Sequence, residues 1–341
     1  MTSSAKSLDQ KLARIHADPA GCRDFILADA KDADMAFGLG APGPRQDGLG
    51  FKSLADYRDQ IRDVVAQGLV DIMLLSASSL EKLAINERLF AGSAVTPAAR
   101  ANDTSDIWVV RGGHYTGLPS RPFRTASLEH ILHGKLDVPA GTPATGADLG
   151  LYSITFTNDL DHDHRALECY REFRLEAERR GFRHFLEVFN PNVDPGIPSA
   201  DIPRFLNDHV ARALAGVPSR GRPLFLKIPY NGPAALEELV SYDPHLVVGI
   251  LGGSAGTTFD AFKLIAEARR HGARVALFGR KINLSEHPLT FIRHPRAIVD
   301  DGLDPSEAVR SYHGELARLG LKPARALADD LQITEQSLRY S

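Results

Sequence analysis

Short apolar runs alternate with longer amphipathic segments along this chain. Eight runs rich in Val, Ile, Leu and Phe stand at residues 25–30, 70–76, 106–110, 151–157, 184–189, 224–229, 245–251 and 274–279. Apolar runs of this length are typical of parallel strands that are covered on both faces. Eight strands that alternate with helices close a (β/α)8 (TIM) barrel, so we predict an α/β fold of this class. A doubly wound open sheet is the main structural alternative.

The predicted helices carry their own start and stop signals. Ser53 precedes an amphipathic segment over residues 54–67, and Gly68 follows its end. Thr257 and Asp260 have the spacing of a capping box, in which each side chain bonds the backbone N–H of the other residue. These signals predict helices that begin at both places.

Two stretches, at residues 36–52 and 111–149, are rich in Gly, Pro, Ser and Thr and show no lasting periodicity. They predict long loops after the first and third strands. Such loops lie at the catalytic face of a barrel, where they cover the site or reach a neighbouring subunit; mobile surface insertions are the alternative. We predict a single domain over residues 1–341, with an N-terminal extension of about 22 residues.

Composition narrows the possible partners. The formal net charge is −3, so a global field that would attract nucleic acid or anionic membranes is not expected. Cys22 and Cys169 lack the spacing of a disulfide framework or a zinc site. The sequence has no segment near the roughly 20 apolar residues that span a bilayer. We therefore expect a cytoplasmic protein, a homo-oligomer, that acts on a small molecule.

Lys227 is the strongest chemical signal. It interrupts the apolar run LFLKIPY, where a charged side chain would lie within a buried strand. Desolvation favours the neutral amine, which can attack a substrate carbonyl and form an imine. The protonated imine then draws electrons from a neighbouring carbon–carbon bond. The alternative is a lysine that reaches solvent or pairs with a carboxylate.

Glycine-bearing turns follow the last two strands. Gly252, Gly253 and Ser254 follow the seventh strand, and Gly279 and Arg280 follow the eighth. Glycine lets backbone N–H groups approach an anion closely, and barrels bind phosphate at this place. The two turns together predict a phosphate site, with Arg280 as a charged donor.

Further charged residues interrupt or end the apolar runs. Glu187 lies within HFLEVF, on the strand expected beside that of Lys227, where it could shuttle a proton, orient water or form a structural ion pair. Asp29, Lys31 and Asp32 end the first strand, and we expect them at the catalytic rim or in a solvated loop.

Two loop features complete the candidates. Arg111 and His114 follow the third predicted strand and could contact substrate. Residues 158–164, NDLDHDH, have the composition of a metal site, but they precede a helix, where Asn and Asp are ordinary caps. We favour the capping interpretation and expect neither a metal nor another cofactor.

The stretch from about 182 to 300 resembles the class I aldolase superfamily, which includes fructose-bisphosphate and tagatose-bisphosphate aldolases and the autoinducer-2 thiolase. The resemblance rests on FLKIPY, GILGGSAG and HGARVALFGRKINLSEHP in this order. It implies that Lys227 is the Schiff-base lysine on the sixth strand. It also implies that Gly253, Gly279 and Arg280 bind phosphate and that Asp29 is the acidic residue ending the first strand.

The chain departs from the family pattern at three places. Asp-His-Gly after the first strand is replaced by residues 29–31, Asp-Ala-Lys, and Lys281 replaces the Asn after the Gly-Arg pair. A tyrosine acid at the end of the fifth strand is replaced by Phe189. Three residues are then candidates for proton transfer: Glu187, Tyr230 and Tyr152.

The sequence thus favours a class I aldolase-type lyase that cleaves or forms a C–C bond in a phosphorylated ketose or keto acid. One alternative is a metal-assisted lyase, isomerase or hydrolase that uses Asp29, Asp32, Glu187 and His114. Another is a non-catalytic barrel that binds sugar phosphates. The fold itself does not choose among them.

Overall fold

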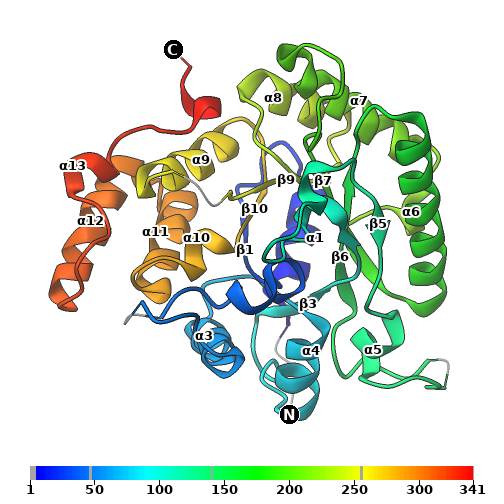
Figure 1. The fold of residues 1–341 in the computed structure, drawn as a ribbon, viewed down its shortest axis with the longest axis horizontal. Helices are drawn as coiled ribbons and strands as arrows, with labels where there is room; N and C mark the ends of the chain where they lie inside the picture. Colours follow the sequence, from blue (N-terminus) through cyan, green and yellow to red (C-terminus); the bar gives the residue numbers. More distant parts are fainter. Residues whose placement is uncertain (1–4, 46–47, 140, 254–255, 341) are drawn as a thin grey trace.

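The computed structural model describes residues 5–45, 48–139, 141–253 and 256–340, and its centre is a closed barrel of eight parallel strands (Figure 1). These strands are β1 (Ile26–Lys31), β2 (Ile72–Leu75), β3 (Thr96–Arg100), β6 (Leu149–Thr155), β7 (Arg183–Phe189), β8 (Leu226–Ile228), β9 (Val248–Leu251) and β10 (Val275–Phe278). They follow one another around the barrel in chain order, and β10 pairs with β1. The predicted barrel is confirmed, and the open-sheet alternative is wrong.

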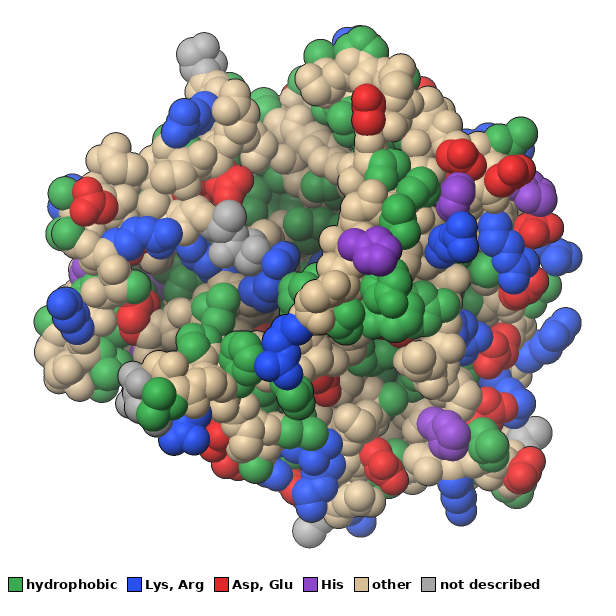
Figure 2. All heavy atoms as spheres, in the orientation of Figure 1, with side chains coloured by type: hydrophobic (Ala, Val, Ile, Leu, Met, Phe, Trp, Pro, Cys, Tyr) green, Lys and Arg blue, Asp and Glu red, His purple; other side chains and the backbone are tan. Residues whose placement is uncertain are grey.

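Helices surround the barrel (Figure 1). The longer ones are α1 (Ser7–Ala17), α3 (Leu54–Gln67), α6 (Leu160–Arg180), α7 (Ile202–Ala215), α8 (Pro233–Tyr242), α9 (Thr258–Arg270), α11 (Pro288–Asp301) and α12 (Pro305–Arg318). Short helices are α2 (Asp34–Phe37), α4 (Ala77–Leu80), α5 (Leu128–His133), α10 (Arg280–Asn283) and α13 (Leu327–Asp330). Within the described ranges, the helices lack the combination of length and apolar composition that crossing a bilayer requires. Figure 2 shows that the face drawn in Figure 1 is hollowed near its centre, with hydrophobic side chains around the hollow.

The predicted helix starts are confirmed. Ser53 and Asp56 form a capping box at α3, and Gly68 ends that helix in the left-handed conformation. Thr257 and Asp260 form the second capping box, at the start of α9. Local side chains therefore accept hydrogen bonds from backbone N–H groups at the starts of both helices.

The third strand was predicted in the wrong place. It occupies Thr96–Arg100, whereas residues 105–107 form a short 3-10 helix. Trp108, Val109 and Val110 are each more than 40% exposed, so this run is not a covered strand. The true strand was missed because its buried centre is Ala98 and Ala99, whose small side chains give a weak hydrophobic signal. Beyond it, β4 (Asp103–Thr104) and β5 (Pro122–Phe123) form a separate two-stranded antiparallel sheet.

Side chains along each barrel strand alternate between the interior and the surrounding helices. In β1, Ile26 and Ala28 pack in the interior cluster, whereas Leu27 packs in the cluster between strands and helices. The same alternation applies to every strand because successive side chains point to opposite faces. It decides which polar residues near the carboxyl ends of the strands enter the barrel.

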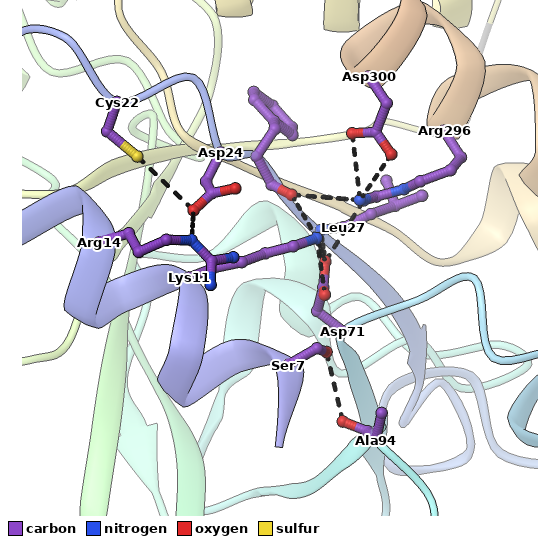
Figure 3. Close-up of polar contacts among 11 residues, drawn as sticks. Ser7, Lys11, Arg14, Cys22, Asp24, Leu27, Asp71, Ala94, Arg296 and Asp300 are labelled. Carbon is purple, nitrogen blue, oxygen red and sulfur yellow. Dashed lines mark hydrogen bonds and ion pairs between the residues drawn. The ribbon is translucent and has the colours of Figure 1, made fainter. Parts of the chain in front are cut away.

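A polar network fixes α1 across the amino-terminal end of the barrel (Figure 3). The Asp71 carboxylate accepts a hydrogen bond from the backbone N–H of Leu27 at 2.9 Å and from Lys11 Nζ at 2.8 Å. Arg296 of α11 lies 3.3 Å from the same carboxylate. Asp71 is buried, so one carboxylate joins α1, β1 and α11 at a place that water reaches poorly.

We expect Asp71→Asn to lower the free energy of unfolding by about 3 kcal/mol, because Lys11 and Arg296 would keep their charges without their shared buried counter-charge. Urea denaturation measures this change. Asp300→Asn is the matched control, since Asp300 also contacts Arg296 but is half exposed. Its expected effect is below about 1 kcal/mol. Equal losses for the two variants would contradict the proposed importance of Asp71.

Candidate active site

Two oppositely charged side chains face each other inside the barrel. Lys227 on β8 and Glu187 on β7 are register partners, and Lys227 Nζ lies 2.5 Å from Glu187 Oε1. Lys227 is 7% exposed and Glu187 is 1% exposed. Unpaired charges at such burial are costly, so each side chain serves as the counter-charge of the other.

A second buried ion pair adjoins the first. Arg100, at the end of β3, places its Nε 2.5 Å from Asp32 Oδ2, and its guanidinium lies 3.8 Å from Glu187 Oε2. Burial alone would lower the pKa of Arg100, but the carboxylates of Asp32 and Glu187 outweigh burial and raise that pKa. Arg100 therefore stays a cation, and Glu187 lies between two cations.

Ser153 of β6 completes the hydrogen bonding of Glu187. Its hydroxyl donates to Glu187 Oε2 at 2.6 Å and accepts from Arg100 at 3.3 Å. Asn102 holds the Ser153 backbone by two hydrogen bonds: its side-chain oxygen accepts from the Ser153 N–H at 2.6 Å, and its side-chain NH2 donates to the Ser153 C=O at 2.9 Å. One oxygen of Glu187 is thus fixed by Ser153 and Arg100, and the other is directed at Lys227.

A small cavity lies at the carboxyl ends of the strands. Its volume is about 120 Å³, and it brings together six of the predicted site residues, Lys227, Glu187, Gly252, Gly253, Gly279 and Arg280. Asp32 and Arg100 line it as well. The predicted phosphate ligand Ser254 lies outside the described residues.

The two turns beside this cavity use glycine for different reasons. Gly253 has a φ of +58°, a conformation that other residues adopt at a cost. At Gly279, a Cβ atom would lie 2.7 Å from the carbonyl oxygen of Ala30, so a larger residue would push β10 away from β1.

Arg280 follows Gly279 and borders the cavity. Its guanidinium lies 5.1 Å from the centre of the Phe37 ring. Among the residues that the structure describes, Arg280 donates no hydrogen bond and forms no ion pair within 4 Å. Burial lowers the pKa of Arg280, and Glu187 partly opposes that effect. The group is a partly buried cation whose donors are available to an anion.

Asp29 and Lys31 lie elsewhere than the sequence predicted. They occupy the outward-facing row of β1, and Lys31 Nζ lies 3.4 Å from Asp29 Oδ2 and 5.9 Å from the centre of the Tyr57 ring of α3. Both side chains are completely buried between strand and helix. Burial raises the pKa of Asp29 to about 6 and lowers the pKa of Lys31. Since side chains alternate, Asp32 beyond the strand enters the cavity instead.

Tyr230 also follows an outward-facing row. Its hydroxyl lies 2.8 Å from that of Tyr340, which donates to Glu267 of α9 at 2.6 Å. The phenol is therefore bound to the C-terminal segment and α9, and the structure does not bring it together with Lys227. Burial raises the pKa of Tyr230.

The two predicted loop residues lie outside the small cavity. Arg111 borders a larger neighbouring pocket, and it is exposed. His114 is exposed too, with its ring centre 5.5 Å from that of Tyr115.

The run NDLDHDH serves as a helix cap. Asp159 accepts hydrogen bonds from the backbone N–H groups of Asp161 and His162 at the start of α6. Across the described parts of the chain, no three His, Cys, Asp or Glu side chains are grouped so that they could hold a metal ion. The donors proposed for a metal-assisted reaction do not converge, because Asp29 faces the helices and His114 lies on an exposed loop.

Sequence reasoning missed Arg100, Ser153 and Asn102. The cause is the misplaced third strand: when residues 106–110 are taken as the strand, Arg100 and Asn102 lie outside the predicted barrel. One signal in the sequence could have revealed Arg100: it is the last residue of the short segment TPAAR, which lies where the third strand is expected after the second. Ser153 required the strand register, which no local pattern gives.

Several solved aldolase structures have a similar fold. A Schiff-base-forming fructose-1,6-bisphosphate aldolase is 18% identical and has a TM-score of 0.59, with 86% of this chain and 100% of that chain covered. The fructose-bisphosphate aldolase from Slackia heliotrinireducens is 13% identical, with a TM-score of 0.63 and coverage of 90% and 91%. A third structure is an archaeal fructose-1,6-bisphosphate aldolase whose catalytic lysine is covalently bound to the carbinolamine intermediate of its substrate. It is 17% identical and has a TM-score of 0.58, with 86% of this chain and 99% of that chain covered.

These likenesses confirm the (β/α)8 barrel, and the solved structures that share it include the kind of aldolase that the sequence resembles. No protein-family model and no curated protein matches the chain. At such low identity the likeness extends to the fold alone, so the chemistry has to be argued from the residues of this chain.

The buried Asp29 predicts a pH dependence of stability. Its pKa is about 6 in the folded protein, above the usual value of 3.8, so the folded state binds this proton more tightly. The stability it contributes is complete below about pH 4 and is lost as pH rises through 6. Over this pH range, we expect the unfolding free energy of the wild type to fall by up to about 3 kcal/mol relative to that of Asp29→Asn.

Urea denaturation at pH 4, 5, 6 and 7 measures the difference. Asp59→Asn serves as the control, because the Asp59 side chain is 69% exposed. A difference for Asp29→Asn that stays constant over the same range would show that this carboxyl group does not titrate abnormally.

Proposed function

We propose that this protein is a class I aldolase-type lyase that cleaves or forms a C–C bond next to a carbonyl group of a phosphorylated ketose or keto acid. The observation that carries the proposal is the Lys227 amine, buried inside the barrel 2.5 Å from Glu187 in a cavity bordered by Arg280. A lysine so placed has the access and the proton acceptor that imine formation needs.

The first steps use Lys227 and Glu187. Glu187 accepts a proton from the Lys227 ammonium, and the freed amine attacks the substrate carbonyl carbon to give a carbinolamine. The protonated Glu187 then donates to the carbinolamine oxygen, which leaves as water and creates an iminium. Ser153 and Arg100 hold the second carboxylate oxygen, so the first oxygen stays directed at the reacting atoms.

Cleavage follows from the electron demand of the iminium. The bond that breaks joins the carbon next to the iminium to a carbon that bears a hydroxyl group. A base removes the proton of that hydroxyl group, the bonding pair moves towards the iminium, and the hydroxyl-bearing carbon leaves as an aldehyde. The remaining enamine takes up a proton, and water hydrolyses the imine to restore Lys227. Asp32 and Glu187 both line the cavity and are the carboxylates within reach of these protons.

Arg280 and the adjacent glycine turns bind the anionic group of the substrate. Arg280 is a cation without a carboxylate partner among the described residues, beside Gly253 and Gly279 at the place where barrels bind phosphate. A substrate phosphate or carboxylate would supply the missing counter-charge.

Reduction with borohydride tests the covalent step. We expect wild-type protein incubated with dihydroxyacetone phosphate, a phosphorylated ketose or pyruvate to gain the mass of the reduced adduct, and peptide mapping to place it on Lys227. Lys227→Met should abolish the gain. Lys31→Met is the matched control, since Lys31 is fully buried but faces the helices; its adduct should persist. An adduct on another lysine, or none with any substrate, refutes the mechanism.

Glu187→Gln tests the proton acceptor. We expect the rate of imine formation and kcat to fall by about 10²–10⁴-fold, because the amide cannot accept the lysine proton, whereas the adduct at Lys227 still accumulates slowly. Single-turnover trapping at a series of times measures the rate. Glu176→Gln is the control, since Glu176 pairs with Arg124 outside the barrel. A wild-type rate in Glu187→Gln would assign the proton transfer to another group.

A further inference from the structure

A second, larger pocket opens beside the catalytic cavity. It has a volume of about 620 Å³, against about 120 Å³ for the cavity around Lys227. Pockets that bind metabolite-sized ligands usually measure roughly 300–1,000 Å³. The small cavity therefore has room for the reacting carbonyl and its nearest atoms, and the rest of a substrate needs the larger pocket.

The two spaces adjoin each other. Ala33, Phe37 and Arg280 line both of them. Arg280 stacks on the Phe37 ring at their boundary, at 5.1 Å from the ring centre. A substrate anchored at Lys227 would enter the larger pocket at this boundary.

The larger pocket has an apolar lining. Its walls include Leu39, Phe51, Val109, Val110 and Leu284, which are 41–73% exposed. Single exposed apolar side chains are ordinary, but a contiguous set around one pocket marks a binding surface. Arg111, Arg280 and Asn283 are the charged or amide side chains in the lining as far as the structure is described.

Hydrogen bonds join the walls of the pocket. The backbone N–H of Val109 donates to the carbonyl of Ala36 at 2.8 Å. The Asn283 side-chain amide donates to the carbonyl of Ala41 at 2.9 Å. Three segments that are distant in the sequence are joined in this way, and Asn283 uses one of its side-chain N–H groups for this contact.

We propose that this pocket binds an apolar arm, alkyl or aryl, of the aldehyde that Lys227 joins to its enamine or releases by cleavage. The proposal rests on the proposed function and specifies its substrate. A polyhydroxylated arm would need a hydrogen-bond partner for each hydroxyl group, and burying it against this lining would leave most of them unsatisfied. An apolar arm gains free energy from the same surface.

The chemistry balances without a further reagent. The donor carbonyl forms an imine with Lys227 and loses a proton from the adjacent carbon to become an enamine. The enamine carbon bonds to the aldehyde carbon, the aldehyde oxygen takes up that proton, and water hydrolyses the imine. The apolar arm stays in the larger pocket throughout.

The test compares aldehydes that differ in polarity. With the donor that gives the borohydride adduct, kcat/KM is measured for glycolaldehyde, butanal and phenylacetaldehyde. We expect phenylacetaldehyde to exceed glycolaldehyde by at least about tenfold. Leu39→Asp should reduce this ratio by about tenfold, because it places a charge in the lining. Leu136→Asp, the same change at a 53% exposed leucine outside the pocket, should leave the ratio unaltered.

Other results overturn the proposal. If the adduct forms but glycolaldehyde is used as well as phenylacetaldehyde, or Leu39→Asp keeps the wild-type ratio, the pocket does not select an apolar arm, although the lyase function stands. If Leu39→Asp instead dissociates an oligomer in light scattering while the ratio persists, the apolar surface is an interface between copies of the chain.

A binding measurement separates this proposal from the covalent chemistry. Calorimetry with 3-phenylpropanol on Lys227→Met reports the pocket without any imine. Binding that is weakened about tenfold by adding Leu39→Asp, but not by adding Leu136→Asp, supports an apolar ligand even if no donor ever forms an adduct. Absence of binding overturns the inference independently of the proposed function.

Discussion

The arrangement of this site depends on the need to balance the charge of Lys227 inside an apolar barrel. An ammonium group so far from water requires a carboxylate beside it, and Glu187 on the adjacent strand meets that requirement at 2.5 Å. The carboxylate is itself buried, so Arg100 and Ser153 bind its other oxygen, and Asp32 in turn pairs with Arg100. Each partner is explained by the previous one, and the series ends at Asp32.

This ordering connects stability with chemistry. Because both oxygens of Glu187 are occupied, its carboxylate cannot rotate away from Lys227 without losing a hydrogen bond to Ser153 at 2.6 Å. Fixed donors and acceptors of this kind lower the cost of reorganisation during a reaction. Because Glu187 pairs with Lys227 and Arg100, Arg280 has no carboxylate partner among the described residues and is available to an anion at the cavity.

Most of the fold was predictable, whereas only part of the site was. Seven strands with large β-branched or aromatic residues produced clear apolar runs, but β3 has Ala98 and Ala99 at its centre and was assigned to an exposed run instead. Lys227 and Glu187 stood out because a charge within an apolar run is conspicuous. Arg100 could be found only with the third strand in its correct place. Asp29 and Lys31 were misplaced because neighbouring residues of β1 point to opposite faces, so an error of one residue moves a side chain to the other face.

Among the described residues, two lysine–carboxylate pairs lie at the carboxyl ends of barrel strands, and their comparison shows why one of them is proposed to react. Asp29 and Lys31 are as buried as any residues in the protein, but they face α3, where no substrate can enter between strand and helix. Lys227 and Glu187 are buried too, yet they border a cavity that adjoins a pocket of about 620 Å³. Burial alone therefore does not identify a nucleophile; the side of the strand on which a lysine lies decides whether its amine can meet a carbonyl group.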